Sequence, residues 1–148
     1  MKIIPSSGGT YIVLVELAAP TTITIGKLGD LSLIAGFYAY VGSAHGPGGL
    51  AARLRRYEVG PRRLHWHIDY LLEKADLIGA VFRADAEQRE CSWARWIANR
   101  AQEHVPGFGS SDCRCASHLY LIGGVDEMRE MTRACGCQLK TLAMIEAR

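Results

Sequence analysis

The sequence predicts a small domain of the α/β (α+β) class, with a mainly antiparallel sheet and helices packed against it. Short apolar segments rich in β-branched and aromatic residues recur along the chain, as at 10–17, 36–41 and 75–82. Several neighbouring strands are joined by connections too short for a crossover helix, so we expect antiparallel pairing. With 148 residues, the chain has the length of a single domain with its own core.

Turn residues and caps predict the order of the elements. Turn chemistry at 26–30 separates two short apolar segments, which we therefore expect to form a hairpin. Pro61 separates two helices, and Asp85 is expected to cap the third. The expected strands are 10–17, 21–25, 31–35, 36–41, 75–82 and 118–122, and the expected helices are 50–57, 64–74, 85–103 and 125–133.

Charge is nearly balanced over the whole chain but uneven along it. There are 17 Lys and Arg residues against 15 Asp and Glu, a net charge of +2. No segment approaches the roughly 20 apolar residues of a membrane span, and no secretory leader precedes the first strand, so a cytoplasmic protein is expected. A local cluster of arginines offers contacts to phosphates. It consists of Arg53, Arg55, Arg56, Arg62 and Arg63, with Glu58 among them.

Four side chains suggest chemistry. Alternation along the strands places Tyr11 and Tyr40 on faces that can converge, although strand tyrosines are commonly core or rim residues. Arg53 follows in a basic helix, where it can pair with a phosphate or simply lie on a solvated face. Glu90 starts from the apolar stripe of its helix and needs a partner there, either an arginine in a salt bridge or a hard divalent cation.

These residues lie within strings that resemble the GIY-YIG nuclease superfamily, and in particular its Uri-type branch. The resemblance covers nearly the whole chain, from Gly8 to about Ile122. The strings are GTYIVLVEL, YAYVGSAHGPGGLAARLRRY, LHWHIDYLL, Glu90-Cys91 and GFGSSDCRCASHL. The chain departs from the family pattern in its extra hairpin, in reading GTY for GIY, and in having Tyr57 where many relatives carry histidine.

The resemblance implies a three-stranded antiparallel core sheet flanked by helices, and cleavage of DNA phosphodiester bonds. It implies one domain over 1–148, with a core at about 8–105 and a strand-helix extension at about 106–148. Tyr11 and Tyr40 match the motif tyrosines, Arg53 the helix arginine, and Glu90 the ligand for Mg²⁺ or Mn²⁺. One tyrosine would accept the proton of the attacking water, which requires a phenol pKa below its usual value of about 10.

We therefore expect a DNA endonuclease that acts on single-stranded, branched or damaged DNA, as in repair, and that is a monomer or a transient homodimer. An inactive nucleic-acid-binding module and a zinc-binding interaction protein are the alternatives. The glycine-rich loop 42–49 is expected to contact the DNA backbone or to be a plain turn. The residues expected to contact DNA are Ser43, His45, Arg55, Arg56, Tyr57, Arg62, Arg63, His65 and His67.

The five cysteines, without a secretory leader, indicate reduced thiols or a metal site. Two close pairs stand near a histidine, and four of these five groups offer tetrahedral coordination to zinc. The candidate ligands are Cys113, Cys115, His118, Cys135 and Cys137. Buried free thiols are the alternative. Trp93 and Trp96 are expected to pack in the core.

Overall fold

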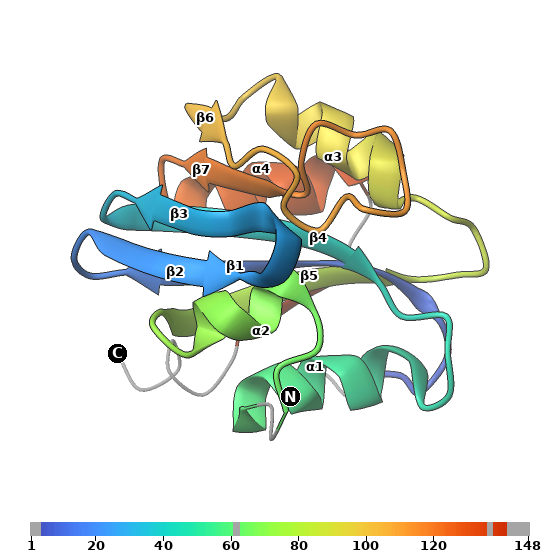
Figure 1. Cartoon of the computed structure of the whole chain (residues 1–148). Coiled ribbons are helices and arrows are strands. Elements are labelled where there is room, and N and C mark those ends of the chain that lie inside the picture. The colour runs from blue at the N-terminus through green and yellow to red at the C-terminus, as the bar shows by residue number, and fades with distance from the viewer. Residues whose placement is uncertain (1–3, 61–62, 136–137, 142–148) are drawn as a thin grey trace.

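The centre of the molecule is three long antiparallel strands, β1 (Gly9–Leu17), β4 (Gly36–Ser43) and β5 (Asp76–Ala84). Strand β1 lies in the middle and pairs with β4 on one side and with β5 on the other. The computed structural model describes residues 4–60, 63–135 and 138–141 (Figure 1). The expected three-stranded antiparallel core is therefore confirmed, with each strand within a few residues of its predicted bounds.

Three shorter strands extend this sheet at both edges. In the described part of the chain the order is β6-β7-β4-β1-β5-β8, and every pairing is antiparallel. Strand β7 (Leu119–Ile122) matches the predicted strand at 118–122, whereas β6 (Glu103–His104) and β8 (Gln138–Thr141) were not predicted. Both are too short to carry an alternating pattern of their own, so only pairing with a neighbour defines them.

The predicted hairpin is also confirmed, as a separate two-stranded sheet of β2 (Thr21–Ile25) and β3 (Gly29–Leu33). Its second strand begins earlier than the expected 31–35, because the 3₁₀ turn η1 (Gly26–Leu28) is short and Gly29 adopts a positive φ of 73°. Apolar residues of both strands pack into the core cluster beneath the main sheet.

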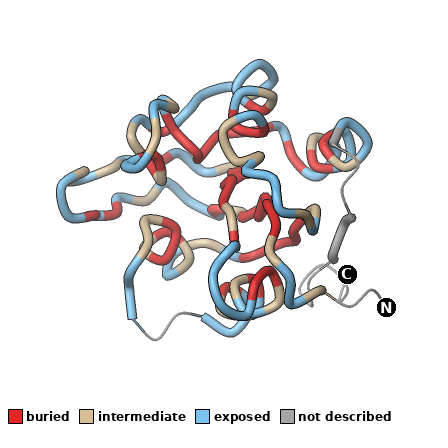
Figure 2. The backbone as a smooth tube through the Cα atoms, turned by 90° about the vertical axis from the view of Figure 1, so that its right-hand side faces the viewer, coloured by how far each residue is buried: buried red, intermediate tan, exposed pale blue. Residues whose placement is uncertain are grey.

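Helices cover both faces of the main sheet. One face packs on α1 (Gly49–Val59), α2 (His67–Leu72) and the hairpin, and the other packs on α3 (Glu90–Ala98) and α4 (Val125–Cys135) (Figure 1). Buried positions follow the central strands and the inward sides of these helices (Figure 2). Trp93 lies in the core of the second face and Trp96 packs against that core, as expected.

Two helices begin later than the sequence predicts. In each case an aspartate carboxylate binds residues that precede the first turn of the helix. Helix α2 begins at His67 instead of Leu64, since the Asp69 carboxylate accepts the backbone N–H groups of His65 and Trp66. Helix α3 begins at Glu90 instead of Asp85, because the Asp85 carboxylate binds arginine side chains on either side of it. Asp85 is therefore not the predicted cap.

Candidate functional site

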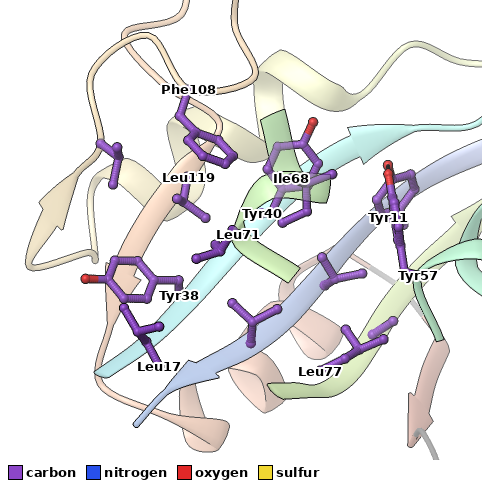
Figure 3. Close-up of a cluster of buried hydrophobic side chains, with 14 of the residues drawn as sticks. Tyr11, Leu17, Tyr38, Tyr40, Tyr57, Ile68, Leu71, Leu77, Phe108 and Leu119 are labelled. Carbon is purple, nitrogen blue, oxygen red and sulfur yellow. Dashed lines mark hydrogen bonds between the residues drawn. The ribbon is translucent and has the colours of Figure 1, made fainter. Parts of the chain in front are cut away.

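The register of β1 and β4 brings the two motif tyrosines to the same face of the sheet. Tyr11 lies opposite Gly42, and Tyr40 lies opposite Val13, two positions away. Residues on one face at such a diagonal are close enough for aromatic side chains to reach each other. Both tyrosines are buried in the cluster that includes α1 and α2 (Figure 3). The expectation that the two tyrosines share a face of the sheet is confirmed.

Gly42 makes room for the first of these rings. A Cβ atom at this position would lie 2.4 Å from the Tyr11 hydroxyl oxygen, which is closer than such atoms approach in proteins. The glycine that closes the second motif is thus explained by the tyrosine of the first, on the neighbouring strand. The need for glycine here is not visible in the sequence, because the strand partner of Gly42 is set by the register of β1 and β4.

Arg53 on α1 is held over the end of the sheet. Its Nη1 donates to the backbone carbonyl of Ser43 at 3.0 Å and to the Tyr11 hydroxyl at 3.4 Å. Its guanidinium carbon lies 4.1 Å from the centroid of the Trp66 ring, a cation–π arrangement. These contacts fix a positive charge directly above the Tyr11 phenol.

Tyr57, one helical turn beyond Arg53, joins the same buried group. Its hydroxyl lies 2.5 Å from that of Tyr11, and only 3% of the residue is exposed. Figure 3 shows Tyr11 and Tyr57 beside each other, with Tyr40 on the adjacent strand. The expectation that Tyr57 contacts DNA is wrong, because its side chain faces the core.

Burial controls the acidity of these phenols. It raises the pKa of Tyr11, and the nearby charge of Arg53 opposes this rise only in part. Burial also raises the pKa of Tyr40 and of Tyr57 well above the ordinary value. The expected lowering of a phenol pKa is therefore wrong for the protein alone, and Tyr11 is the least shifted of the three.

Glu90 lies at the start of α3 and reaches the end of β4. Its Oε1 accepts a hydrogen bond from Ser43 Oγ at 3.0 Å, and its Oε2 lies 2.8 Å from His118 Nδ1. The side chain remains 26% exposed. Its charge is close enough to raise the pKa of Tyr40, after the larger effects of burial and of Tyr11. The partner of Glu90 is thus a histidine and a serine, not the expected arginine.

The carboxylate of Glu90 is a suitable ligand for a hard divalent cation. It offers carboxylate oxygen at a partly exposed position, and Mg²⁺ is often held by one or two carboxylates, with water and substrate phosphate as the remaining ligands. Glu90 is the residue of this group that can supply such a ligand.

The described arginines of the cluster differ in their environment: some are paired with other protein groups and others are exposed. Arg56 Nη2 lies 2.6 Å from the buried carboxylate of Asp69, and its side chain is 26% exposed, so a DNA contact by Arg56 stays a prediction. Arg55 and Arg63 are exposed and remain candidates for phosphate contacts. Arg62 lies outside the described residues.

The amides at the start of α1, which follows the glycine-rich loop, are not free to bind an anion. The first N–H groups of α1 donate to backbone carbonyls of the N-terminal segment, Leu50 to Ser7 and Ala51 to Pro5, and Gly49 donates to Gly46. A phosphate cradle at this helix N-terminus is therefore excluded for these three amides. His45 on the same loop is exposed, so a side-chain contact with DNA stays a prediction.

The two histidines next to α2 differ. His65 is exposed and its ring contacts Trp66 edge-on. His67 Nδ1 accepts the N–H of Gly109 at 2.7 Å, and its ring packs against Phe108. Burial lowers the pKa of His67. His67 therefore anchors the loop before β7 as a structural histidine, and the expected contact of His67 with DNA stays a prediction.

Trp66 is the residue of this region that sequence analysis missed. It was placed within a helix, but it is the N-cap residue of α2, and it lies against the guanidinium groups of both Arg53 and Arg56. A hollow of about 360 Å³ opens beside these three side chains and the glycine-rich loop. The sequence signal that could have identified Trp66 is its place between two histidines, a few positions after the arginine cluster.

A second cluster of side chains lies next to Glu90, and one of its members, His118, contacts the Glu90 carboxylate. The ligand atoms of Cys91, Cys113, Cys115 and His118 all lie within 4.8 Å of one another. Burial raises the pKa of the Cys115 thiol to about 12, and the neighbouring thiols add to the rise. Cys91 was not among the predicted zinc ligands. Of the predicted ones, Cys137 lies outside the described residues, and the side chain of Cys135 is not described.

Comparisons with known proteins place the chain in a family without assigning a function. No helix in the described residues has both the length and the apolar character needed to cross a bilayer. No curated protein and no solved structure matches the chain. A family model described as a domain of unknown function, DUF123, matches residues 10–141. Because this match spans most of the chain, the protein belongs to the DUF123 family.

Proposed function

We propose that this protein is a metal-dependent endonuclease that hydrolyses DNA phosphodiester bonds. The observation that carries the proposal is that Tyr11, Arg53 and Glu90 approach one another from β1, α1 and α3. Ser43 connects them, because its carbonyl accepts from Arg53 and its hydroxyl donates to Glu90. The sequence resemblance named these three residues independently of their spatial arrangement.

Arg53 binds the scissile phosphate in this proposal. A guanidinium can pair with two phosphate oxygens and offset the charge that develops on phosphorus as water attacks. Arg53 lines the hollow beside Trp66, so a phosphate entering there meets this side chain. The exposed side chains of Arg55 and Arg63 extend the positive surface available to the DNA backbone.

Tyr11 is the favoured base among the tyrosines. It accepts a hydrogen bond from Arg53, and the positive charge of Arg53 opposes the rise in pKa that burial causes. Tyr11 is only 1% exposed, so the Arg53 side chain must turn toward the phosphate to open a path for water. Because burial favours the neutral phenol, Tyr11 must first release its proton to solvent, a step that the positive charge of Arg53 favours. The resulting phenolate accepts a proton from the water that adds to phosphorus. The bond from phosphorus to the 3′ oxygen then breaks, and the leaving 3′ oxygen takes up a proton from solvent.

Glu90 holds the divalent cation in this scheme. Bound Mg²⁺ or Mn²⁺ supplies positive charge that stabilises the departing 3′ oxygen. Ser43 and His118 hold the carboxylate of Glu90 on two sides, so its orientation is set before substrate arrives. Such preorganisation lowers the cost of assembling the site at the moment of reaction.

The test is cleavage of end-labelled single-stranded, duplex, flap and abasic DNA with Mg²⁺, Mn²⁺ or EDTA. We expect metal-dependent cutting that falls about a hundredfold or more in Arg53→Ala and in Glu90→Gln. The matched controls are Arg129→Ala on α4 and Glu73→Gln, which change exposed residues of the same types away from the site. Each variant should keep the circular dichroism spectrum of the wild-type protein.

The same experiment distinguishes the nuclease from an inactive nucleic-acid-binding module. Binding of labelled DNA without cleavage of any substrate, under every metal condition, contradicts the nuclease and indicates a nucleic-acid-binding module. Equal loss in the control variants would show that the effect of Arg53→Ala and Glu90→Gln is not specific to the site.

A further inference from the structure

Four potential soft-metal ligands converge where α3 begins. Cys91 comes from the first turn of α3, and Cys113, Cys115 and His118 come from the loop that leads into β7. Cys113 Sγ lies 3.4 Å from His118 Nε2. In a tetrahedral zinc site, with bonds of about 2.3 Å to sulfur and 2.0–2.1 Å to nitrogen, ligand atoms lie roughly 3.5–3.8 Å apart. The spacing in this cluster is close to that geometry.

We propose that Cys91, Cys113, Cys115 and His118 bind one Zn²⁺ ion, and that this ion, through His118, orients Glu90. Three thiolates and one imidazole form a closed ligand set with no open position for a substrate, which is typical of structural zinc. Thiolate ligands also select zinc over the oxygen-preferring Mg²⁺. The cluster and the proposed catalytic metal site therefore take different ions.

The loop that supplies three of the ligands is held at both ends, and the proposed ion lies at its middle. It runs from β6 to β7 with little regular structure, and long loops of this kind in compact domains usually have a specific role. Phe108 anchors its first half in the core, and the backbone of His118 bonds to Phe108 and to Val41 of β4. Between these points, the half-buried Cys113 and Cys115 face Cys91 across the cluster. Zinc would fasten this middle section of the loop to α3.

His118 links the zinc site to Glu90. Its Nε2 faces Cys113, and its Nδ1 lies 2.8 Å from Glu90 Oε2. An imidazole that ligates zinc through Nε2 carries its proton on Nδ1, and donates it to a carboxylate in many zinc sites. The buried Nδ1 has no hydrogen-bond partner among the described residues, and the Glu90 carboxylate is the acceptor that lies within reach of it. Zinc at Nε2 would place the proton on Nδ1, the nitrogen that faces Glu90.

Zinc binding is tested without any assay of activity. We expect purified protein to carry about one zinc per chain, and the Co²⁺-substituted protein to show the intense absorption of tetrahedral thiolate coordination. Cys91→Ser and Cys115→Ser should each lower zinc content toward zero after dialysis against a weak chelator. The matched control is the double variant Cys135→Ser/Cys137→Ser, which replaces the remaining cysteines and should keep its zinc.

Two results would overturn the zinc site. One is zinc retained in Cys91→Ser but lost in the double control, which would assign the metal to the other cysteine pair. The other is wild-type protein without zinc that also fails to give the Co²⁺ spectrum when loaded under reducing conditions. The Co²⁺ measurement uses the wild-type chain, so it does not depend on whether a variant folds.

The link to Glu90 rests on the proposed nuclease function and has its own test. His118→Cys keeps a fourth thiolate for zinc but removes the Nδ1 donor to Glu90. We expect this variant to keep its zinc and to need a higher Mg²⁺ concentration for half-maximal cleavage, by tenfold or more. An unchanged Mg²⁺ requirement with zinc retained would overturn the positioning role. Zinc bound to a wild-type protein that cuts no DNA would contradict the nuclease and leave the zinc site established.

Discussion

Arg56 of α1 and Asp69 of α2 form an ion pair of 2.6 Å in which the Asp69 side chain is fully buried. The same carboxylate oxygen also accepts the backbone N–H groups of His65 and Trp66. One side chain therefore joins two helices and fixes the start of α2. Because Trp66 in turn packs on Arg53, this ion pair supports the wall of the proposed DNA site.

Removal of Asp69 is expected to destabilise the protein strongly. Asp69→Ala leaves the Arg56 guanidinium and two backbone donors without their partner, and breaking a buried pair costs about 3–5 kcal/mol. We expect the lower end of this range, because the Arg56 side chain is 26% exposed. The measurement is urea unfolding, with Arg55→Ala as the matched control on the exposed side of α1, where a change within about 0.5 kcal/mol is expected. A similar small effect of Asp69→Ala would contradict the role of the pair.

Gly42→Ala should be destabilising, because its methyl group would meet the Tyr11 ring. Overpacking of this kind typically costs about 1–3 kcal/mol. The control is Gly46→Ala in the following loop, where an added Cβ meets no atom within 4 Å. Thermal unfolding of both variants checks the prediction, and equal melting temperatures would show that Tyr11 has room to move.

The buried tyrosines predict a loss of stability in alkaline solution. Burial raises the pKa of Tyr11, Tyr40 and Tyr57 in the folded state, so the neutral phenol is favoured there. Their contribution to stability is complete below the unfolded-state pKa of about 10 and is lost as the pH rises through that value toward the folded-state pKa. Urea unfolding at a series of alkaline pH values should show this decline. It should be weaker in Tyr11→Phe/Tyr57→Phe, and an equal decline in both proteins would exclude Tyr11 and Tyr57 as its source.

His67 predicts a second loss of stability in acid. Burial lowers its pKa, and its neutral Nδ1 accepts the N–H of Gly109. The unfolded chain therefore takes up the proton first, so stability is complete above about pH 6.5 and falls as the pH drops through that value. His67→Asn places a similar acceptor there without a titrating group. Comparison of urea unfolding near neutral pH and near pH 5.5 should show a smaller loss in this variant, and an equal loss in both proteins would assign the acid sensitivity elsewhere.

Much of the framework follows from the sequence alone, because strand periodicity is a local property. Alternation predicted which neighbours of Tyr11 and Tyr40 share a face of each strand, and the turn at 26–30 predicted the hairpin. Apolar spacing determined that Trp93 and Ala94 of α3 face the core, with Glu90 at the edge of the same stripe. These features depend on neighbours within a few positions along the chain.

The tertiary structure alone decided which distant groups share an environment. Cys91 lies beside Cys113 and Cys115 because α3 and the loop before β7 pack together, and no spacing in the sequence reports that contact. Asp69 accepts backbone N–H groups of His65 and Trp66, and Asp85 binds Arg83 and Arg89, so both helices begin later than expected. Burial of the Tyr11 and Tyr57 pair raised phenol pKa values that charge counting alone would lower. In each case a long-range contact or loss of solvent outweighed the local preference, and such terms exist only once the chain has folded.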